Sequence, residues 1–201
     1  MSFAVLFVCT GNICRSPAAE RLFRAGLRTG ALLTVTSAGT SGLTGYPIDG
    51  RTARALQELG IDTDGHRARR VERQMLRASD LVLTAAIEHR AAVLRAEPSL
   101  LSRAFTLREF GRLSAESNEA RPSAAPTDAE LRTRVAAIAR QRGLAGPAGP
   151  AENDIADPYG APLEIARATV AQILQEVDVA LAGLGLRQEH GPRVRPLTKR
   201  G

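Results

Sequence analysis

The amino-terminal segment, residues 3–17, has the sequence Phe3-Ala4-Val5-Leu6-Phe7-Val8-Cys9-Thr10-Gly11-Asn12-Ile13-Cys14-Arg15-Ser16-Pro17. Its first six residues are apolar, which predicts a buried strand over residues 3–8. The small and polar residues that follow predict a loop, and Pro17 suits the first turn of a helix, with Ser16 as its candidate cap. A loop between a strand and a helix turns successive backbone N–H groups toward one point. The segment therefore predicts a binding site for an oxyanion.

Cys9 and Arg15 add reactive groups to this loop. The Cys–x5–Arg spacing lets the thiol lie beneath the loop amides while the guanidinium closes the site with paired donors. A positive field favours the thiolate, which is the nucleophilic form of cysteine. Cys14 does not follow the strand directly, so Cys9 is the candidate nucleophile. The alternative is that both cysteines are only buried core residues. A nucleotide-binding P-loop would need a lysine here, and the only lysine of the chain is Lys199.

The composition limits the expected partners and cofactors. The chain has 201 residues and a formal net charge of +6, but its arginines are dispersed and not interleaved with aromatic residues. We therefore expect no nucleic acid as a partner, although a basic surface suits acidic phosphorylated substrates. Three scattered histidines (His66, His89 and His190) and two cysteines in one loop predict no metal site, no cofactor and no disulfide framework. Without a signal peptide or a membrane-spanning apolar run, we expect a cytoplasmic protein.

Apolar strands alternate with amphipathic helices along the chain. The patterns predict strands at 3–8, 32–37, 80–84 and 104–107, and helices at 17–29, 49–60, 87–96 and 163–184. They also predict a short helix or a turn at 71–77. This alternation predicts an α/β fold, a four-stranded parallel twisted sheet with helices on both faces. Ligands of such folds bind beyond the carboxyl ends of the strands, where Cys9 lies.

We predict one domain over residues 1–185. A Pro-, Ala- and Gly-rich insertion at 114–153 is expected on the surface, partly helical at Asp128–Gln141 and otherwise a flexible loop. The basic tail at 186–201 is expected to be disordered.

Residues 5–20, Val-Leu-Phe-Val-Cys-Thr-Gly-Asn-Ile-Cys-Arg-Ser-Pro-Ala-Ala-Glu, resemble the signature of the low-molecular-weight protein tyrosine phosphatases. The resemblance extends over about residues 3–113 and 154–185. It implies a three-layer, phosphotyrosine phosphatase I-like fold. It also implies metal-independent hydrolysis of phosphotyrosine through a phosphocysteine at Cys9. The phosphate-binding residues that it implies are Thr10, Gly11, Asn12, Ile13, Cys14 and Arg15.

The resemblance also implies roles outside this loop. Asp157-Pro158-Tyr159 is similar to the family's Asp-Pro-aromatic loop, which makes Asp157 the implied general acid and base. The implied loop supports are Asn12, Ser16, Ser37 and His66, with Asn12 in an unusual backbone conformation. The implied walls of the substrate pocket are Ile13, Leu43 and Tyr159. Two roles stay open for Cys14: a disulfide with an oxidised Cys9, or packing behind the loop.

Two positions depart from the family pattern. Ala85-Ala86 stand where the family often carries an acidic residue, and Leu43 stands where an aromatic wall is expected, with Tyr46 close by. Both changes concern pocket shape and substrate preference.

Several functions share this signature. Arginine phosphatases commonly have Thr where this chain has Ile13, so Ile13 favours phosphotyrosine. Two further functions stay open: a thiol-dependent arsenate reductase of the same fold, and a non-catalytic module that binds phosphate or phosphoproteins. The binding module would be expected to lack Cys9 or Asp157. The implied partner is a tyrosine-phosphorylated protein, with a bacterial tyrosine kinase as one candidate, and the chain is expected to be a monomer or weak dimer.

Overall fold

The sheet is the centre of the molecule. The computed structural model describes residues 2–116, 126–143 and 149–188. Within these residues, parallel strands form one sheet in the order β2-β1-β3-β4. They are β1 (Ala4–Cys9), β2 (Thr34–Gly39), β3 (Leu81–Thr84) and β4 (Ala104–Thr106). The predicted fold class and the parallel sheet are confirmed.

Helices connect and cover these strands. In chain order they are α1 (Arg15–Gly26), α2 (Gly50–Gln57), α3 (Arg73–Ala78), α4 (Ile87–Ala96), the 3₁₀ turn η1 (Pro98–Leu100), α5 (Leu107–Glu116), α6 (Asp128–Gln141), α7 (Pro150–Asn153) and α8 (Leu163–Leu184). Among these described helices, none combines the length and the hydropathy that a membrane crossing needs.

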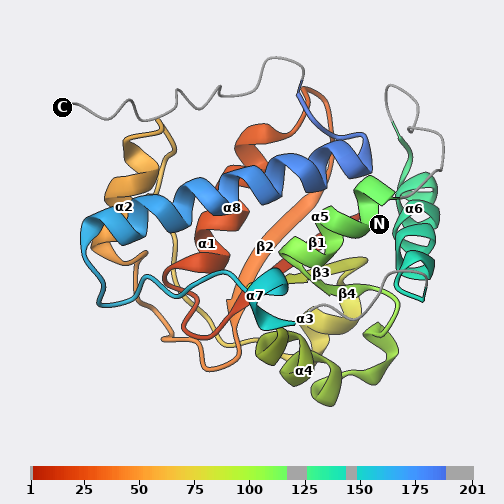
Figure 1. Ribbon diagram of the computed structural model, residues 1–201, viewed down its shortest axis with the longest axis horizontal. Coiled ribbons are helices and arrows are strands. Elements are labelled where there is room, and N and C mark those ends of the chain that lie inside the picture. The colour runs from red at the N-terminus through yellow and green to blue at the C-terminus, as the bar shows by residue number, and fades with distance from the viewer. Residues whose placement is uncertain (1, 117–125, 144–148, 189–201) are drawn as a thin grey trace.

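Side chains of β1 alternate between the two faces of the sheet, as the period of a strand requires. Phe3, Val5 and Phe7 lie in a core shared with α1, α5 and α8, whereas Leu6 and Val8 pack with α3 and α4. Figure 1 shows α8 lying across α1 and α5. Helices cover both faces of the sheet, so a binding site is expected at the carboxyl ends of the strands.

Helix α5 is missing from the sequence prediction. Gly111 lies in its middle, and glycine is a poor helix former. Gly111 is suited to this position because α5 packs closely against α8 there. A Cβ at this position would lie 3.3 Å from side-chain atoms of both Glu176 and Val179.

Helix α6 is the helix predicted within the 114–153 insertion, but it is packed on the core rather than loosely on the surface. Leu131, Val135 and Ile138 are buried and join the core that contains α5 and α8. Their spacing places them on one face of a helix, which explains the packing. The segments 117–125 and 144–148 of the insertion lie outside the described residues.

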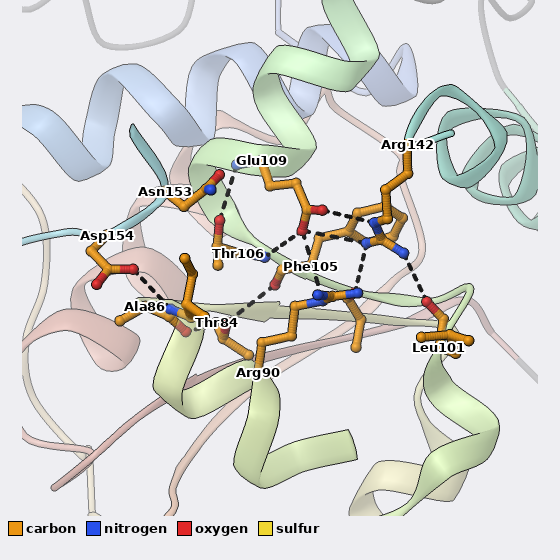
Figure 2. A network of polar contacts seen from close by, with 12 residues as sticks. Thr84, Ala86, Arg90, Leu101, Phe105, Thr106, Glu109, Arg142, Asn153 and Asp154 are labelled. Carbon is orange, nitrogen blue, oxygen red and sulfur yellow. Dashed lines mark hydrogen bonds and ion pairs between the residues drawn. The ribbon is translucent and has the colours of Figure 1, made fainter. Parts of the chain in front are cut away.

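Arg142 follows α6 directly and contacts the edge strand β4 (Figure 2). Its guanidinium lies 4.2 Å from the centre of the Phe105 ring, donates to Glu109 Oε1 at 2.7 Å and donates to the Ala104 carbonyl at 2.9 Å. Arg90 of α4 donates to the same carbonyl at 2.8 Å. Side chains therefore satisfy a carbonyl of the edge strand.

The predicted start of the tail at residue 186 is wrong for residues 186–188. Gly185 ends α8 in the left-handed conformation (φ 71°) and turns the chain back. Leu186 is buried, Arg187 pairs with Leu27, and the Gln188 amide donates to the Gly26 carbonyl at 3.0 Å. Residues 189–201 lie outside the described residues.

Candidate active site

Residues 9–16, here called the nucleophile loop, join the end of β1 to the start of α1. Cys9 is the last residue of β1, and Cys14 occupies the N-cap position of α1. Ser16 is therefore inside the helix, and its prediction as the cap is wrong. Its hydroxyl is engaged elsewhere, 3.1 Å from Cys9 Sγ.

The carbonyl groups of this loop point away from its centre. Five consecutive carbonyls, from Cys9 to Ile13, accept hydrogen bonds of 2.8 to 3.0 Å from surrounding segments. In chain order the donors are the amides of Thr40, Ser41 and Leu43, the His66 ring and the amide of Asp49. In a trans peptide the N–H points opposite to the C=O. The amides of residues 10–14 therefore point away from those donors, toward the opposite side of the loop, which is the arrangement that an oxyanion site needs.

Asn12 locks the shape of the loop. It is fully buried, and it is the one non-glycine residue with positive φ (56°) among the described residues. The side-chain nitrogen of Asn12 donates to Ser16 Oγ and Ser37 Oγ, both at 2.9 Å. Its side-chain oxygen, Oδ1, accepts from the Arg69 amide at 2.9 Å. These bonds fix a conformation that L-residues otherwise avoid.

Glu20 extends this network, and sequence reasoning missed it. Ser37 donates to Glu20 Oε2 at 2.6 Å, so the serine accepts from Asn12 and donates to the carboxylate. Glu20 also pairs with Arg24 at 3.0 Å. The spacing of Ser16 and Glu20 was an available signal, because residues four apart share a helix face.

His66 and Gly39 brace the loop from outside. The His66 ring donates to the Asn12 carbonyl at 2.8 Å, because a carbonyl oxygen can only accept. Burial lowers the pKa of His66. Gly39, at the end of β2, allows close approach, because a Cβ there would lie 2.3 Å from the Thr10 carbonyl oxygen. Its neighbour Thr40 can then reach the Cys9 carbonyl.

The two cysteines have different surroundings, although both are free and buried. Burial raises the pKa of Cys14 to about 12, and a hydrogen bond with Thr52 only partly opposes this. Cys14 packs with Ile13 and Ala68. A thiol in this environment stays protonated at neutral pH and is a poor nucleophile.

Arg15 connects the nucleophile loop to the segment that contains Asp157. Its Nη2 donates to Asp157 Oδ2 at 2.6 Å, and its Nη1 donates to the Ile155 carbonyl at 3.1 Å. Arg15 is buried, but the Asp157 side chain is 48% exposed. Arg15 Nε is buried without a hydrogen-bond partner in the described part of the chain.

His89, on α4, is a second residue that sequence reasoning missed. Its Nε2 lies 2.8 Å from Thr10 Oγ1, so it contacts the nucleophile loop directly. The residue is buried, and burial, together with the charge of Arg15, lowers its pKa. No sequence signal pointed to His89, since α4 brings it to the loop from 79 residues away.

The expected pocket walls lie on different segments. Ile13 is buried, Leu43 is 40% exposed and Tyr159 is 64% exposed. Leu43 is tied to the nucleophile loop by its amide, which donates to the Gly11 carbonyl, and the Tyr159 amide donates to Asp157 Oδ1 at 3.3 Å. No group of three His, Cys, Asp or Glu side chains that could hold a metal ion occurs among the described residues.

A comparison with protein families identifies the family of this chain. Residues 4–138 match the low molecular weight phosphotyrosine protein phosphatase family, and the chain belongs to this family. The match includes the nucleophile loop, Ser37 and His66. Asp157 lies beyond its end.

Individual relatives agree with this assignment. The low molecular weight protein-tyrosine-phosphatase Etp of Escherichia coli K12 is 40% identical over 97 residues, which are 48% of this chain and 64% of Etp. The match thus spans less than two thirds of that relative. A low molecular weight protein tyrosine phosphatase from T. tengcongensis has a TM-score of 0.64 at 29% identity, covering 90% of this chain and 98% of its own. The YwlE arginine phosphatase of Geobacillus stearothermophilus has a TM-score of 0.63 at 25% identity, covering 88% and 89%.

Proposed function

We propose that this chain is a protein-tyrosine phosphatase that hydrolyses phosphotyrosine through a phosphocysteine at Cys9. The observation that carries the proposal is the outward turn of five consecutive loop carbonyls, which leaves the amides facing the end of the strand where Cys9 lies. The buried Arg15 Nε supplies a further donor that no described protein group uses. Together these donors match the oxygens of a phosphoryl group.

In the first step, the Cys9 thiolate attacks phosphorus and the bond from phosphorus to the phenolic oxygen breaks. Asp157 gives its proton to the departing phenolate. In the second step, Asp157 takes a proton from water, the water oxygen attacks phosphorus, and the bond from phosphorus to sulfur breaks. Ser16, 3.1 Å from Cys9 Sγ, stabilises the returning thiolate by donating a hydrogen bond.

The ion pair between Arg15 and Asp157 must break when the substrate phosphate binds. Its 2.6 Å contact occupies guanidinium donors that the phosphate would need. An incoming phosphate replaces the carboxylate as the partner of Arg15. The carboxyl of Asp157 is then free to hold the proton for the leaving oxygen.

Phosphoarginine is the second candidate substrate, because a solved structure of similar fold is an arginine phosphatase. The aliphatic side chain of Ile13 lies in the nucleophile loop and favours a phenyl ring as its neighbour. Exposed Leu43 and Tyr159 are the proposed walls of the slot that admits this ring. We therefore place phosphotyrosine ahead of phosphoarginine.

The test is steady-state hydrolysis of para-nitrophenyl phosphate in the presence of EDTA, followed by matched phosphotyrosine and phosphoarginine peptides. We expect activity without metal and a higher kcat/KM on the phosphotyrosine peptide. The matched variant Ile13→Thr should move the preference toward phosphoarginine. A wild-type preference for phosphoarginine would overturn the substrate, and an inactive wild type would favour a binding module.

A further inference from the structure

Helix α4 begins without a cap from its own segment. Its N-cap residue is Ala86, which has no side-chain acceptor for the free amides of the first turn. The missing acceptor comes from residue 154: Asp154 Oδ1 accepts from the Ile87 amide at 2.8 Å. Figure 2 shows the Asp154 carboxylate pointing toward this turn, beside Ala86.

The chain around Asp154 is held on two further sides. The Ile155 amide donates to the Ala85 carbonyl at 2.8 Å, and the Ile155 side chain is buried. Arg108 of α5 donates to the Ala151 carbonyl at 2.7 Å and contacts the Asp154 carbonyl at 3.4 Å. The segment is thus fixed up to residue 155, two residues before Asp157.

Pro158 is buried, but the Asp157 side chain itself has few partners. The Asp157 side chain is about half exposed, and its carboxylate accepts from Arg15 at 2.6 Å and from the Tyr159 amide at 3.3 Å. A substrate phosphate would compete for that arginine. The position of the Asp157 carboxyl during the reaction then depends on how firmly residues 154 and 155 are held.

We propose that Asp154 is a positioning residue, which aims Asp157 by joining its loop to the first turn of α4. This inference rests on the proposed function of Asp157 as the acid. The same helix carries His89, whose ring lies 2.8 Å from Thr10 Oγ1 in the nucleophile loop. One rigid helix therefore contacts both halves of the site and sets the acid against the nucleophile.

The experiment compares Asp154→Ala and Asp154→Asn with Asp157→Asn. Their kcat/KM values are measured on phenyl phosphate, a poor leaving group, and on para-nitrophenyl phosphate, a good one. Proton donation matters most for the poor leaving group. We expect Asp154→Ala to lose about tenfold on phenyl phosphate and less than about threefold on the nitrophenyl ester, because misplacing a catalytic group by about 1 Å has large effects. Asp154→Asn should stay near wild type, since its amide oxygen can accept the same bond.

The matched control is Thr127→Ala, which removes the cap of α6 (Thr127 Oγ1 accepts from the Glu130 amide at 3.3 Å). It should lower the thermal unfolding temperature without changing the leaving-group dependence. A second check is Asp154→Ala combined with Asp157→Asn, which should lose no more on phenyl phosphate than Asp157→Asn alone.

The outcomes separate the two proposals. Suppose that Asp157→Asn loses much more kcat/KM on phenyl phosphate than on the nitrophenyl ester. If Asp154→Ala then loses kcat/KM equally on both esters, or loses none, the positioning role of Asp154 is overturned. If Asp157→Asn showed no leaving-group dependence, the assignment of the acid would fail, and the role of Asp154 would fail with it.

Discussion

The nucleophile loop and the loop that carries Asp157 are held in opposite ways. The nucleophile loop is short and mostly buried, and almost every carbonyl and side chain in it has a partner, from Cys9 to Ser16. The loop of Asp157 reaches the site through a few contacts with distant elements, at Ile87, Arg108 and Arg15. Its key side chain is half exposed.

This difference fits the chemistry that we propose for the two loops. A site that stabilises charge gains from fixed dipoles, which need no rearrangement during the reaction. A group that gives and takes a proton must meet the substrate, water and solvent in turn. In our proposal the nucleophile loop binds the phosphate and the loop of Asp157 gives and takes the proton. The following variants test this division.

The largest effect is expected for the nucleophile itself. Cys9→Ser should lower kcat by about 10⁴-fold or more, because removing a nucleophile abolishes the covalent route. Cys14→Ser should keep most of the activity, since burial raises the Cys14 pKa to about 12 and keeps that thiol protonated. Hydrolysis of para-nitrophenyl phosphate measures both variants. Equal losses would contradict the assignment of Cys9.

Arg15 is the residue that contacts both halves of the comparison. Arg15→Lys should lower kcat/KM by about 10²- to 10³-fold, because lysine cannot provide the planar set of donors. Arg21→Lys, on the same helix, is the control and should be near wild type. Isothermal titration with inorganic phosphate gives a second measure, and unchanged phosphate affinity in Arg15→Lys would argue against the clamp.

Asn12 tests whether the buried network gives the nucleophile loop its rigidity. Asn12→Ala should lower the free energy of unfolding by about 2–3 kcal/mol, since it removes buried hydrogen bonds and places alanine in the left-handed region. Asn12→Gly loses the same bonds but tolerates the positive φ, so its loss should be smaller. Urea unfolding monitored by circular dichroism measures both. Equal losses would show that backbone strain is not part of the effect.

The smallest expected effect is the pH dependence of the free energy of unfolding. It comes from His66, which contacts the nucleophile loop. Burial lowers the pKa of His66 below its ordinary value of 6.5, while Glu20 opposes and Arg21 and Arg69 reinforce this shift. Below pH 6.5 the unfolded chain takes up a proton that the folded chain resists, so stability falls as the pH falls.

His66→Gln should flatten this dependence, as measured by urea unfolding between pH 5 and about 8. Some slope should remain, because the pKa of His89 is lowered in the same direction. An unchanged slope in His66→Gln would show that His66 does not titrate with folding.

The sequence by itself determined the parts of this protein that are local. Strand, loop and helix follow one another within residues 3–17, so a loop with the cysteine and the arginine could be predicted from adjacent residues. The family resemblance implied an unusual backbone conformation at Asn12, and its φ is 56°. The alternation of apolar strands and helices was enough for the parallel sheet, because period and order dictate it.

Tertiary structure decided what depends on contacts between distant segments. Glu20, His89 and Asp154 join the site through neighbours 17, 79 and 67 residues away. Helix spacing offered a local signal for Glu20, but no local pattern pointed to His89 or Asp154. The core position of α6 and the glycine in α5 were likewise settled by packing against α8 and its neighbours. The reason is physical: a short motif specifies backbone conformation, whereas hydrogen bonds and packing between elements form only when the whole fold brings them together.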